Sequence, residues 1–141
     1  MNKRVMALDV GRKKIGVAIS DVLGISANPW GYIKGEGRKK AIGKIGELIR
    51  EYDIGKVILG VPKNMDGSLG AQAQYCLDFA EDLRKMLNIE IDFIDERLSS
   101  AEAEKLLISA GVSREQRKKV NDKIAASIIL QSFLQKNITT L

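Results

Sequence analysis

The sequence has 141 residues, of which 45% are hydrophobic and 29% are charged, and its formal net charge is +5. This length fits one domain covering residues 1–141, and no apolar run reaches the roughly 18 residues that would span a bilayer. Histidine is absent and cysteine occurs once, at Cys76. These counts exclude Ser-His-Asp and Cys-His catalysis, zinc sites built from histidines or several thiolates, and an internal disulfide. A cytoplasmic protein without membrane attachment is expected, and any enzyme chemistry would depend on carboxylates, hydroxyls, amines or an oxygen-bound cation such as Mg²⁺ or Mn²⁺.

The chain begins with two β-rich runs, residues 5–10 and 15–19, on either side of a short basic stretch that contains Gly11. This pattern predicts a β-hairpin. Asp9 lies near the end of the first run, where a buried carboxylate costs several kcal/mol unless it is paired, hydrogen-bonded or metal-bound. Two interpretations stay open: an edge aspartate that accepts hydrogen bonds from the turn, or a metal ligand held on a rigid strand.

The remaining elements are predicted from hydrophobic periodicity. Residues 25–33 contain Pro29 and favour an edge strand, because proline cannot donate a ladder hydrogen bond. Helical spacing begins at residue 38 and recurs after residue 73, while residues 56–61 and 89–94 are predicted strands. A capping box at Ser99 predicts a helix that ends at Gly111, and a last helix is expected over residues 120–136. The order of these elements indicates an α/β fold with a mixed sheet covered by helices.

Basic residues occur in three separate R-K-K triplets, at residues 12–14, 38–40 and 117–119. Such clusters are typical of proteins that bind polyanions and favour nucleic-acid binding, and the alternative is that each triplet is a solvated turn or helix end. The low aromatic content of 5% favours contact with a phosphate backbone over a base-stacking platform.

Three carboxylates stand out along the chain: Asp9, Glu96 after the last strand, and Asp122 on the inward face of the last helix. Each has a structural explanation, as a turn acceptor, an ion-paired strand end beside Arg97, and a helix N-cap. Together they would suit a pair of Mg²⁺ or Mn²⁺ ions on either side of a phosphodiester.

Four blocks of the sequence resemble, in order, the signature blocks of the YqgF family of pre-16S ribosomal RNA nucleases. They are L-D-V-G-R-K-K-I-G-V-A-I-S-D from residue 8, G-V-P-K-N-M-D-G from residue 60, D-E-R-L-S-S-A-E-A from residue 95, and V-N-D-K-I-A-A-S-I-I-L-Q from residue 120. The family is similar to RuvC-type Holliday junction resolvases within the ribonuclease H-like superfamily. The resemblance implies a ribonuclease H-like fold with a five-stranded sheet, three strands antiparallel and two parallel, flanked by helices.

The resemblance also implies the site and the activity. Asp9, Glu96 and Asp122 match the family's acidic triad, which would bind the metal and carry out catalysis. The expected nucleic-acid-binding positions combine motif matches with the basic triplets: Gly11, Arg12, Lys13, Lys14, Asn64, Asp66, Gly67, Arg97, Lys118 and Lys119. The implied enzyme is a two-metal-ion hydrolase acting on ester bonds, which processes the 5′ end of pre-16S ribosomal RNA as a monomer or homodimer.

Other classes of function remain as alternatives. A Holliday junction resolvase would act on branched DNA and would need two active sites on a symmetric dimer. A non-catalytic nucleic-acid-binding factor would use the same basic clusters with structural carboxylates. A nucleotide-binding phosphotransferase is weakly suggested by D-x-G-x(4)-G from Asp9 to Gly16, but such enzymes need two domains around a cleft.

Overall fold

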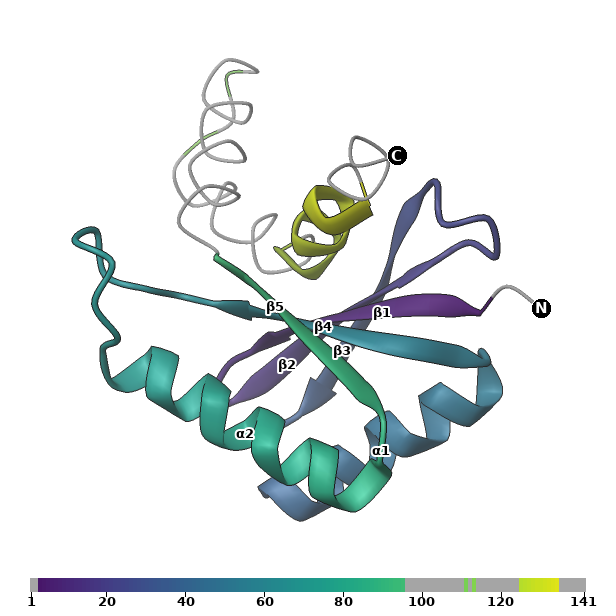
Figure 1. Ribbon diagram of the computed structural model, residues 1–141, viewed down its shortest axis with the longest axis horizontal. Coiled ribbons are helices and arrows are strands. Elements are labelled where there is room, and N and C mark those ends of the chain that lie inside the picture. The colour runs from purple at the N-terminus through teal and green to yellow at the C-terminus, as the bar shows by residue number, and fades with distance from the viewer. Residues whose placement is uncertain (1–2, 96–110, 112, 114–124, 135–141) are drawn as a thin grey trace.

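The computed structural model describes residues 3–95, 111, 113 and 125–134. In these ranges the chain forms one five-stranded sheet with helices on both faces (Figure 1). The labelled elements are β1 (Arg4–Val10), β2 (Lys14–Ser20), β3 (Ala27–Lys34), α1 (Arg38–Glu51), β4 (Ile54–Val61), α2 (Ala71–Leu87) and β5 (Glu90–Asp95). Residues 125–134 form a further helical segment. None of the helices in the described ranges is long and apolar enough to cross a membrane.

The strands lie in the order β3-β2-β1-β4-β5. β1, β2 and β3 are joined by antiparallel pairing, and β4 and β5 continue the sheet parallel to β1. This confirms the predicted mixed sheet with three antiparallel and two parallel strands. It also confirms that the proline-containing strand, β3, lies at an edge of the sheet.

The two faces of the sheet bury different cores because alternate residues of a strand point to opposite faces. Met6 and Leu8 of β1 pack with α1 and α2, whereas Ala7 packs with Ile129 and Leu130 of the helix over residues 125–134. Figure 1 shows α1 and α2 below the sheet and this last helix, in yellow, above it. We call the two sides the α1/α2 face and the last-helix face.

Several predicted boundaries need small corrections. The third strand begins at Ala27 rather than residue 25, because Asp21 accepts hydrogen bonds from the backbone N–H groups of Ile25 and Ser26 and holds that stretch in a loop. β4 begins two residues earlier than predicted, β5 runs one residue later at each end, and α2 begins at Ala71.

After residue 95 the structure describes residues 111, 113 and 125–134, so the predictions for the C-terminal part are compared with the structure only there. Ala126, Ile129 and Phe133 of the predicted inward face are buried, which confirms that side of the last helix. Gly111 has φ 76°, the left-handed conformation typical of a glycine after a helix. The predicted helix over residues 99–110 lies outside the described residues.

Candidate active site

Asp9 lies near the carboxyl end of β1, half-buried, between two strands that carry glycine beside it. Its partner on β2 is Gly16. On β4, Leu8 pairs with Leu59, so the next step of the same register places Gly60 beside Asp9. Register partners point to the same face of a sheet, and neither glycine has a side chain there. Both glycines are buried, whereas Asp9 is half-buried.

Asp9 is on the last-helix face, because alternation along β1 places it with Val5 and Ala7. The adjacent row of that face carries small side chains, Ala18 and Ala7, which allow the helix over residues 125–134 to approach the sheet closely. The aromatic ring of Phe133 lies 5.5 Å from Nζ of Lys56, near the start of β4. The C-terminal part of this helix thus covers the amino-terminal half of β4, away from Asp9.

The parallel strands β1, β4 and β5 end at the same edge of the sheet, where α/β proteins place their sites. Asp95 ends β5 and pairs with Val61, the last residue of β4. Of the predicted triad, Asp9 is described, whereas Glu96 and Asp122 lie outside the described residues. Arg97, Lys118 and Lys119 lie outside them too. Among the residues that are described, no three histidine, cysteine or acidic side chains gather closely enough to hold a metal ion.

The basic turn after β1 is packed tightly against the end of β3. The N–H of Gly11 donates to the carbonyl of Lys14 at 3.0 Å, and the N–H of Gly35 donates to the carbonyl of Lys13 at 2.7 Å. A Cβ atom on Gly11 would lie 2.7 Å from the Lys14 carbonyl oxygen, and one on Gly35 would lie 2.7 Å from that of Arg12. Both positions therefore need glycine, and the turn presents its cations on a rigid backbone.

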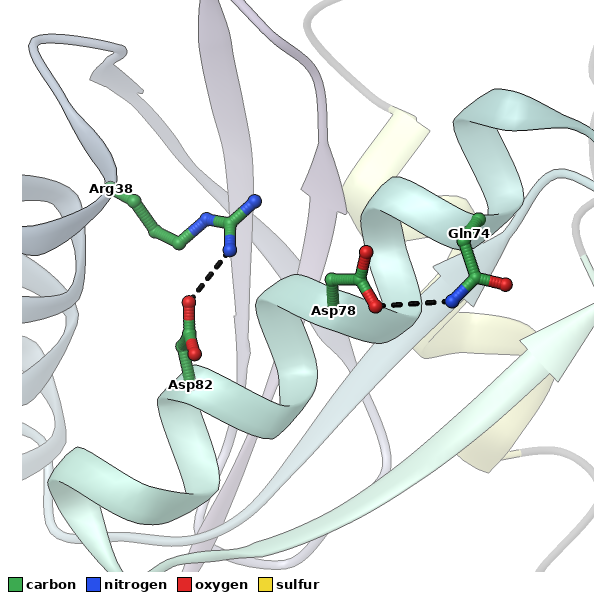
Figure 2. Close-up of polar contacts among 4 residues, drawn as sticks. All are labelled: Arg38, Gln74, Asp78 and Asp82. Atoms are coloured by element: carbon green, nitrogen blue, oxygen red, sulfur yellow. Dashed lines mark hydrogen bonds and ion pairs between the residues drawn. The ribbon is translucent and has the colours of Figure 1, made fainter.

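Arg12 and Arg38 differ in how they are held. Their guanidinium carbons lie 4.8 Å and 5.2 Å from the centre of the Tyr75 ring on α2. Arg38 also donates to Asp82 at 2.7 Å, and Figure 2 shows this contact between α1 and α2 beside the Gln74–Asp78 pair. The hydrogen bond that Arg38 donates to Asp82 raises the pKa of Arg38. Arg38 thus joins two helices, while Arg12 is exposed on the same ring.

Arg12 also shows that the first basic triplet is divided between the two faces of the sheet. Its contact with Tyr75 directs it toward the α1/α2 face. Lys14 is on the same strand as Gly16 and two residues from it, so it points to the face of Asp9. Arg12 and Lys14 therefore point to different faces of the sheet, and the binding of nucleic acid by Arg12, Lys13 and Lys14 stays a prediction.

The loop after β4 uses its predicted site residues to hold its own shape. Asp66 Oδ1 accepts hydrogen bonds from the N–H of Ser68 at 2.9 Å and from its hydroxyl at 2.6 Å. The side-chain amide of Asn64 donates to the same hydroxyl at 3.0 Å. Gly67 has φ 88° and its N–H donates to the Asn64 carbonyl. These residues order an exposed loop at the edge of the sheet where β1 ends.

Two aromatic residues on the edge strand β3 were not among the predicted site residues. Tyr32 of β3 pairs with Gly16, which pairs in turn with Asp9, so all three belong to one row across the sheet. Nζ of Lys14 lies 4.7 Å from the centre of the Tyr32 ring. Trp30 precedes it on the same edge strand. The signal in the sequence was the W-G-Y spacing from Trp30 to Tyr32 on a strand already expected at an edge. It was not used, because the low overall aromatic content favoured contact with a phosphate backbone.

Comparisons with solved structures agree with this architecture. RuvC from Thermus thermophilus aligns with a TM-score of 0.53 at 12% identity, covering 97% of each chain. The Holliday junction resolvase of fowlpox virus aligns with a TM-score of 0.54 at 16% identity, covering 94% of this chain and 99% of the viral one. At such identities the likeness concerns the fold, and it confirms the ribonuclease H-like architecture.

Comparisons of sequence are much closer. Residues 3–136 match the family described as "RuvX: Holliday junction resolvase". A protein of Bacillus cereus (strain AH187) named "Putative pre-16S rRNA nuclease" is 47% identical over 135 residues, covering 94% of this chain and 98% of the relative. A protein of the same name from Bacillus thuringiensis (strain Al Hakam) is 48% identical over 133 residues, covering 93% and 97%. The chain therefore belongs to the RuvX family of nucleases, which confirms the resemblance carried by the four sequence blocks.

Proposed function

We propose that this protein is a metal-dependent nuclease that hydrolyses phosphodiester bonds, and that residues 1–141 are one ribonuclease H-like nuclease domain. The observation that carries the proposal is the position of Asp9. It is a carboxylate at the carboxyl end of a central strand, with glycine on both neighbouring strands. The carboxylate is half-buried on the face that packs against the helix over residues 125–134, near the edge where the parallel strands end.

In this proposal Asp9, Glu96 and Asp122 together bind Mg²⁺ or Mn²⁺. Three facts support it. Carboxylate oxygens are the ligands that both ions prefer. Glu96 directly follows Asp95, which ends β5 at the edge where β1 also ends. Asp122 lies three residues before the helical segment that packs on the face of Asp9.

A pair of bound divalent ions would supply the activation of water and the stabilisation of the leaving oxygen. The chain's own residues would hold and orient the substrate. Lys14 points to the face of Asp9, and Lys13 lies on the same rigid turn, so both would contact phosphates next to the scissile bond. Gly11 and Gly67 would let the nucleic-acid backbone come close, and the loop ordered by Asn64 and Asp66 would border the site. Arg97, Lys118 and Lys119 complete the proposed binding set.

For the substrate we propose structured RNA, with the 5′ end of pre-16S ribosomal RNA as the physiological target in the cytoplasm. The names of the Bacillus relatives support this choice. A second candidate is branched DNA, which the description of the family favours. A junction resolvase would act as a homodimer, because two strands must be cut symmetrically, whereas RNA processing is open to a monomer.

Cleavage assays with and without Mn²⁺ test the proposal on two labelled substrates, a 16S precursor RNA extended at its 5′ end and a four-way DNA junction. We expect Mn²⁺-dependent cleavage of the RNA and a loss of orders of magnitude in Asp9→Asn. Asp78→Asn is the matched control, since Asp78 is an exposed aspartate of α2 on the other face of the sheet (Figure 2). Faster cleavage of the junction would favour the second candidate. Cleavage of either substrate by Asp9→Asn at the normal rate would contradict the mechanism.

A further inference from the structure

The edge strand β3 carries two of the exposed aromatic side chains in the described part of the chain. Trp30 is 37% exposed and Tyr32 is 44% exposed. Trp30 occupies a bulge: Val17 pairs with Gly31 and Ala18 pairs with Pro29, which leaves Trp30 without a partner residue on β2. A bulge redirects a side chain at a sheet edge, and such features often lie next to functional sites.

Trp30 and Tyr32 border one hollow of about 280 Å³ between β3 and α1. Three lysines also line it, Lys34 from β3 and Lys40 and Lys44 from α1, against one acid, Glu36. Lys44 is paired with Glu47 on its own helix at 3.4 Å. The hollow therefore combines two exposed aromatic rings with an excess of positive charge.

Lys40 and Lys44 belong to α1 on the α1/α2 face, whereas Tyr32 lies on the face of Asp9, so the hollow spans the β3 edge of the sheet. Tyr32, Gly16 and Asp9 are register partners on successive strands. Since strands lie about 4.8 Å apart, the backbones of Tyr32 and Asp9 are about 10 Å apart. Stacked nucleotides repeat at about 3.4 Å along a strand, so this separation corresponds to about three nucleotides.

We propose that Trp30 and Tyr32 form a base-stacking site for unpaired nucleotides of the substrate strand, a few nucleotides from the bond that is cut. The inference rests on the proposed nuclease function and specifies how its site selects a substrate. Bases would stack on the two rings, while Lys14, Lys34 and Lys40 neutralise the adjoining phosphates. Such a site takes a single-stranded segment and excludes continuous duplex, whose bases are covered by their neighbours.

The charge around the rings favours this occupant over a protein. A protein partner would match an apolar patch with apolar side chains, whereas three lysines beside two aromatic rings match a polyanion that carries flat, stackable groups. The contact between Lys14 and the Tyr32 ring keeps that ring oriented beside a cation.

Trp30 is the only tryptophan of the chain, so its intrinsic fluorescence reports directly on the site. Oligodeoxyuridylate of about 12 nucleotides, the length range of single-strand binding sites, is titrated into the full-length protein in chelator without divalent ions. An abasic oligomer of the same length and charge is the matched ligand. We expect saturable quenching by the base-bearing oligomer, and about tenfold weaker binding without quenching by the abasic one.

Variants test the same claim by an independent readout, fluorescence anisotropy of a labelled oligomer. Tyr32→Ala should weaken binding of the base-bearing oligomer by about tenfold, and Tyr32→Phe should restore it because the ring face is kept. Phe93→Ala is the control, since Phe93 is a 43% exposed aromatic on the opposite edge strand, β5. Equal affinity for both oligomers would overturn the inference, and so would unchanged binding by Tyr32→Ala. Absent quenching of Trp30 by the base-bearing oligomer would assign the two rings to a contact with a protein.

Because no divalent ion is present, these measurements are separate from the cleavage test. Base-dependent quenching in a protein that cleaves no substrate would keep the stacking site and overturn the nuclease. Cleavage that depends on Asp9 in a protein without base-dependent quenching would support the nuclease and overturn the stacking site.

Discussion

At the scale of single residues, Asp9 is distinguished by the face to which it points and by the glycine beside it on β2. Leu8 and Val10 are buried against α1 and α2, while Asp9 points to the opposite face between Gly16 and the position of Gly60. A carboxylate there keeps access to water or a cation, so the strand tolerates it without the several kcal/mol that full burial would cost.

Asp122 is the member of the proposed triad that a helix N-cap explains most simply. Asparagine caps helices about as well as aspartate, so Asp122→Asn should leave the free energy of unfolding nearly unchanged. If Asp122 is a metal ligand, the lost negative charge should lower Mn²⁺-dependent cleavage by orders of magnitude. Denaturant unfolding and cleavage assays on the same preparation separate the two effects. Cleavage at the normal rate would move the search for a third ligand to Asp95 or Asp66.

Asp21 gives a prediction about pH. Hydrogen bonds from the N–H groups of Ser26 and Ile25 hold the pKa of this carboxyl below its ordinary value of 3.8. Since the folded-state pKa is depressed, its stabilising contribution is complete above the unfolded-state pKa and is lost as pH falls through the lower, folded value. In NMR titrations the amide shifts of Ile25 and Ser26 should therefore change together below pH 3.8. Asp21→Asn should abolish the titration, and a midpoint above 3.8 would contradict it.

At the scale of elements, the cations of the basic turn differ from Arg38 of α1 in the contacts that they make. Arg38 of α1 is bound to Asp82 of α2 and stacks on Tyr75, so it contributes to helix packing. The turn that contains Lys13 is held by backbone hydrogen bonds and leaves its side chains exposed. Lys13 is exposed to solvent on this turn, whereas Arg38 is held between the two helices.

Replacing Arg12, Lys13 and Lys14 with glutamine should weaken binding of nucleic acid and flatten its dependence on salt. Each phosphate contact that is lost reduces the slope of log K against log[salt] by about 0.7 for single strands and 0.9 for duplex. If all three residues contact phosphates, the slope should fall by about two to three. Binding assays over a range of salt concentrations measure it.

The matched control for that triple variant removes the same charge from the opposite ends of the helices. Arg50 of α1 and Arg84 and Lys85 of α2 are exposed and lie in the last turns of their helices. Their replacement with glutamine should leave the slope within about 0.5 of the original, less than one phosphate contact. Equal slopes for the two triple variants would mean that net charge alone, and no defined groove, attracts the substrate.

At the scale of the whole molecule, the two faces of the sheet differ in the residues that they bury. The α1/α2 face holds the larger buried core, and the last-helix face carries Asp9 above a row of small side chains. A metal bound by the folded chain and not by the unfolded chain would stabilise the folded state.

Mn²⁺ should therefore raise the melting temperature of the protein. A ligand present at 100 times its dissociation constant stabilises the folded state by about 2.7 kcal/mol, which for a chain of this size corresponds to a shift of roughly 5–10 °C. Thermal unfolding followed by circular dichroism over a Mn²⁺ series measures the effect. Asp9→Asn should lose most of the shift, while Asp78→Asn should keep it. A shift that survives in Asp9→Asn would indicate a metal site elsewhere.

The sequence by itself determined the strands and helices, the edge position of β3 and the membership of the family. These depend on local patterns: apolar runs for β1 and β4, helical spacing from residue 38, Pro29 in an edge strand, and four short blocks in a specific order. Asp9 could be chosen as a candidate ligand for the same reason, because a carboxylate near the end of an apolar run is visible without any tertiary contact.

Only the tertiary structure decided which residues share a face and a row with Asp9. Pairing between strands brings Gly16 beside it and Tyr32 into the same row, and Tyr75, more than sixty residues away in the chain, draws Arg12 to the other face. Such placements depend on register and on long-range packing. A shift of one residue in register would reverse the face of every side chain on a strand. The hydrophobic pattern predicts which side of a strand is buried, but the partners on strands distant in the chain are decided only when those strands pair.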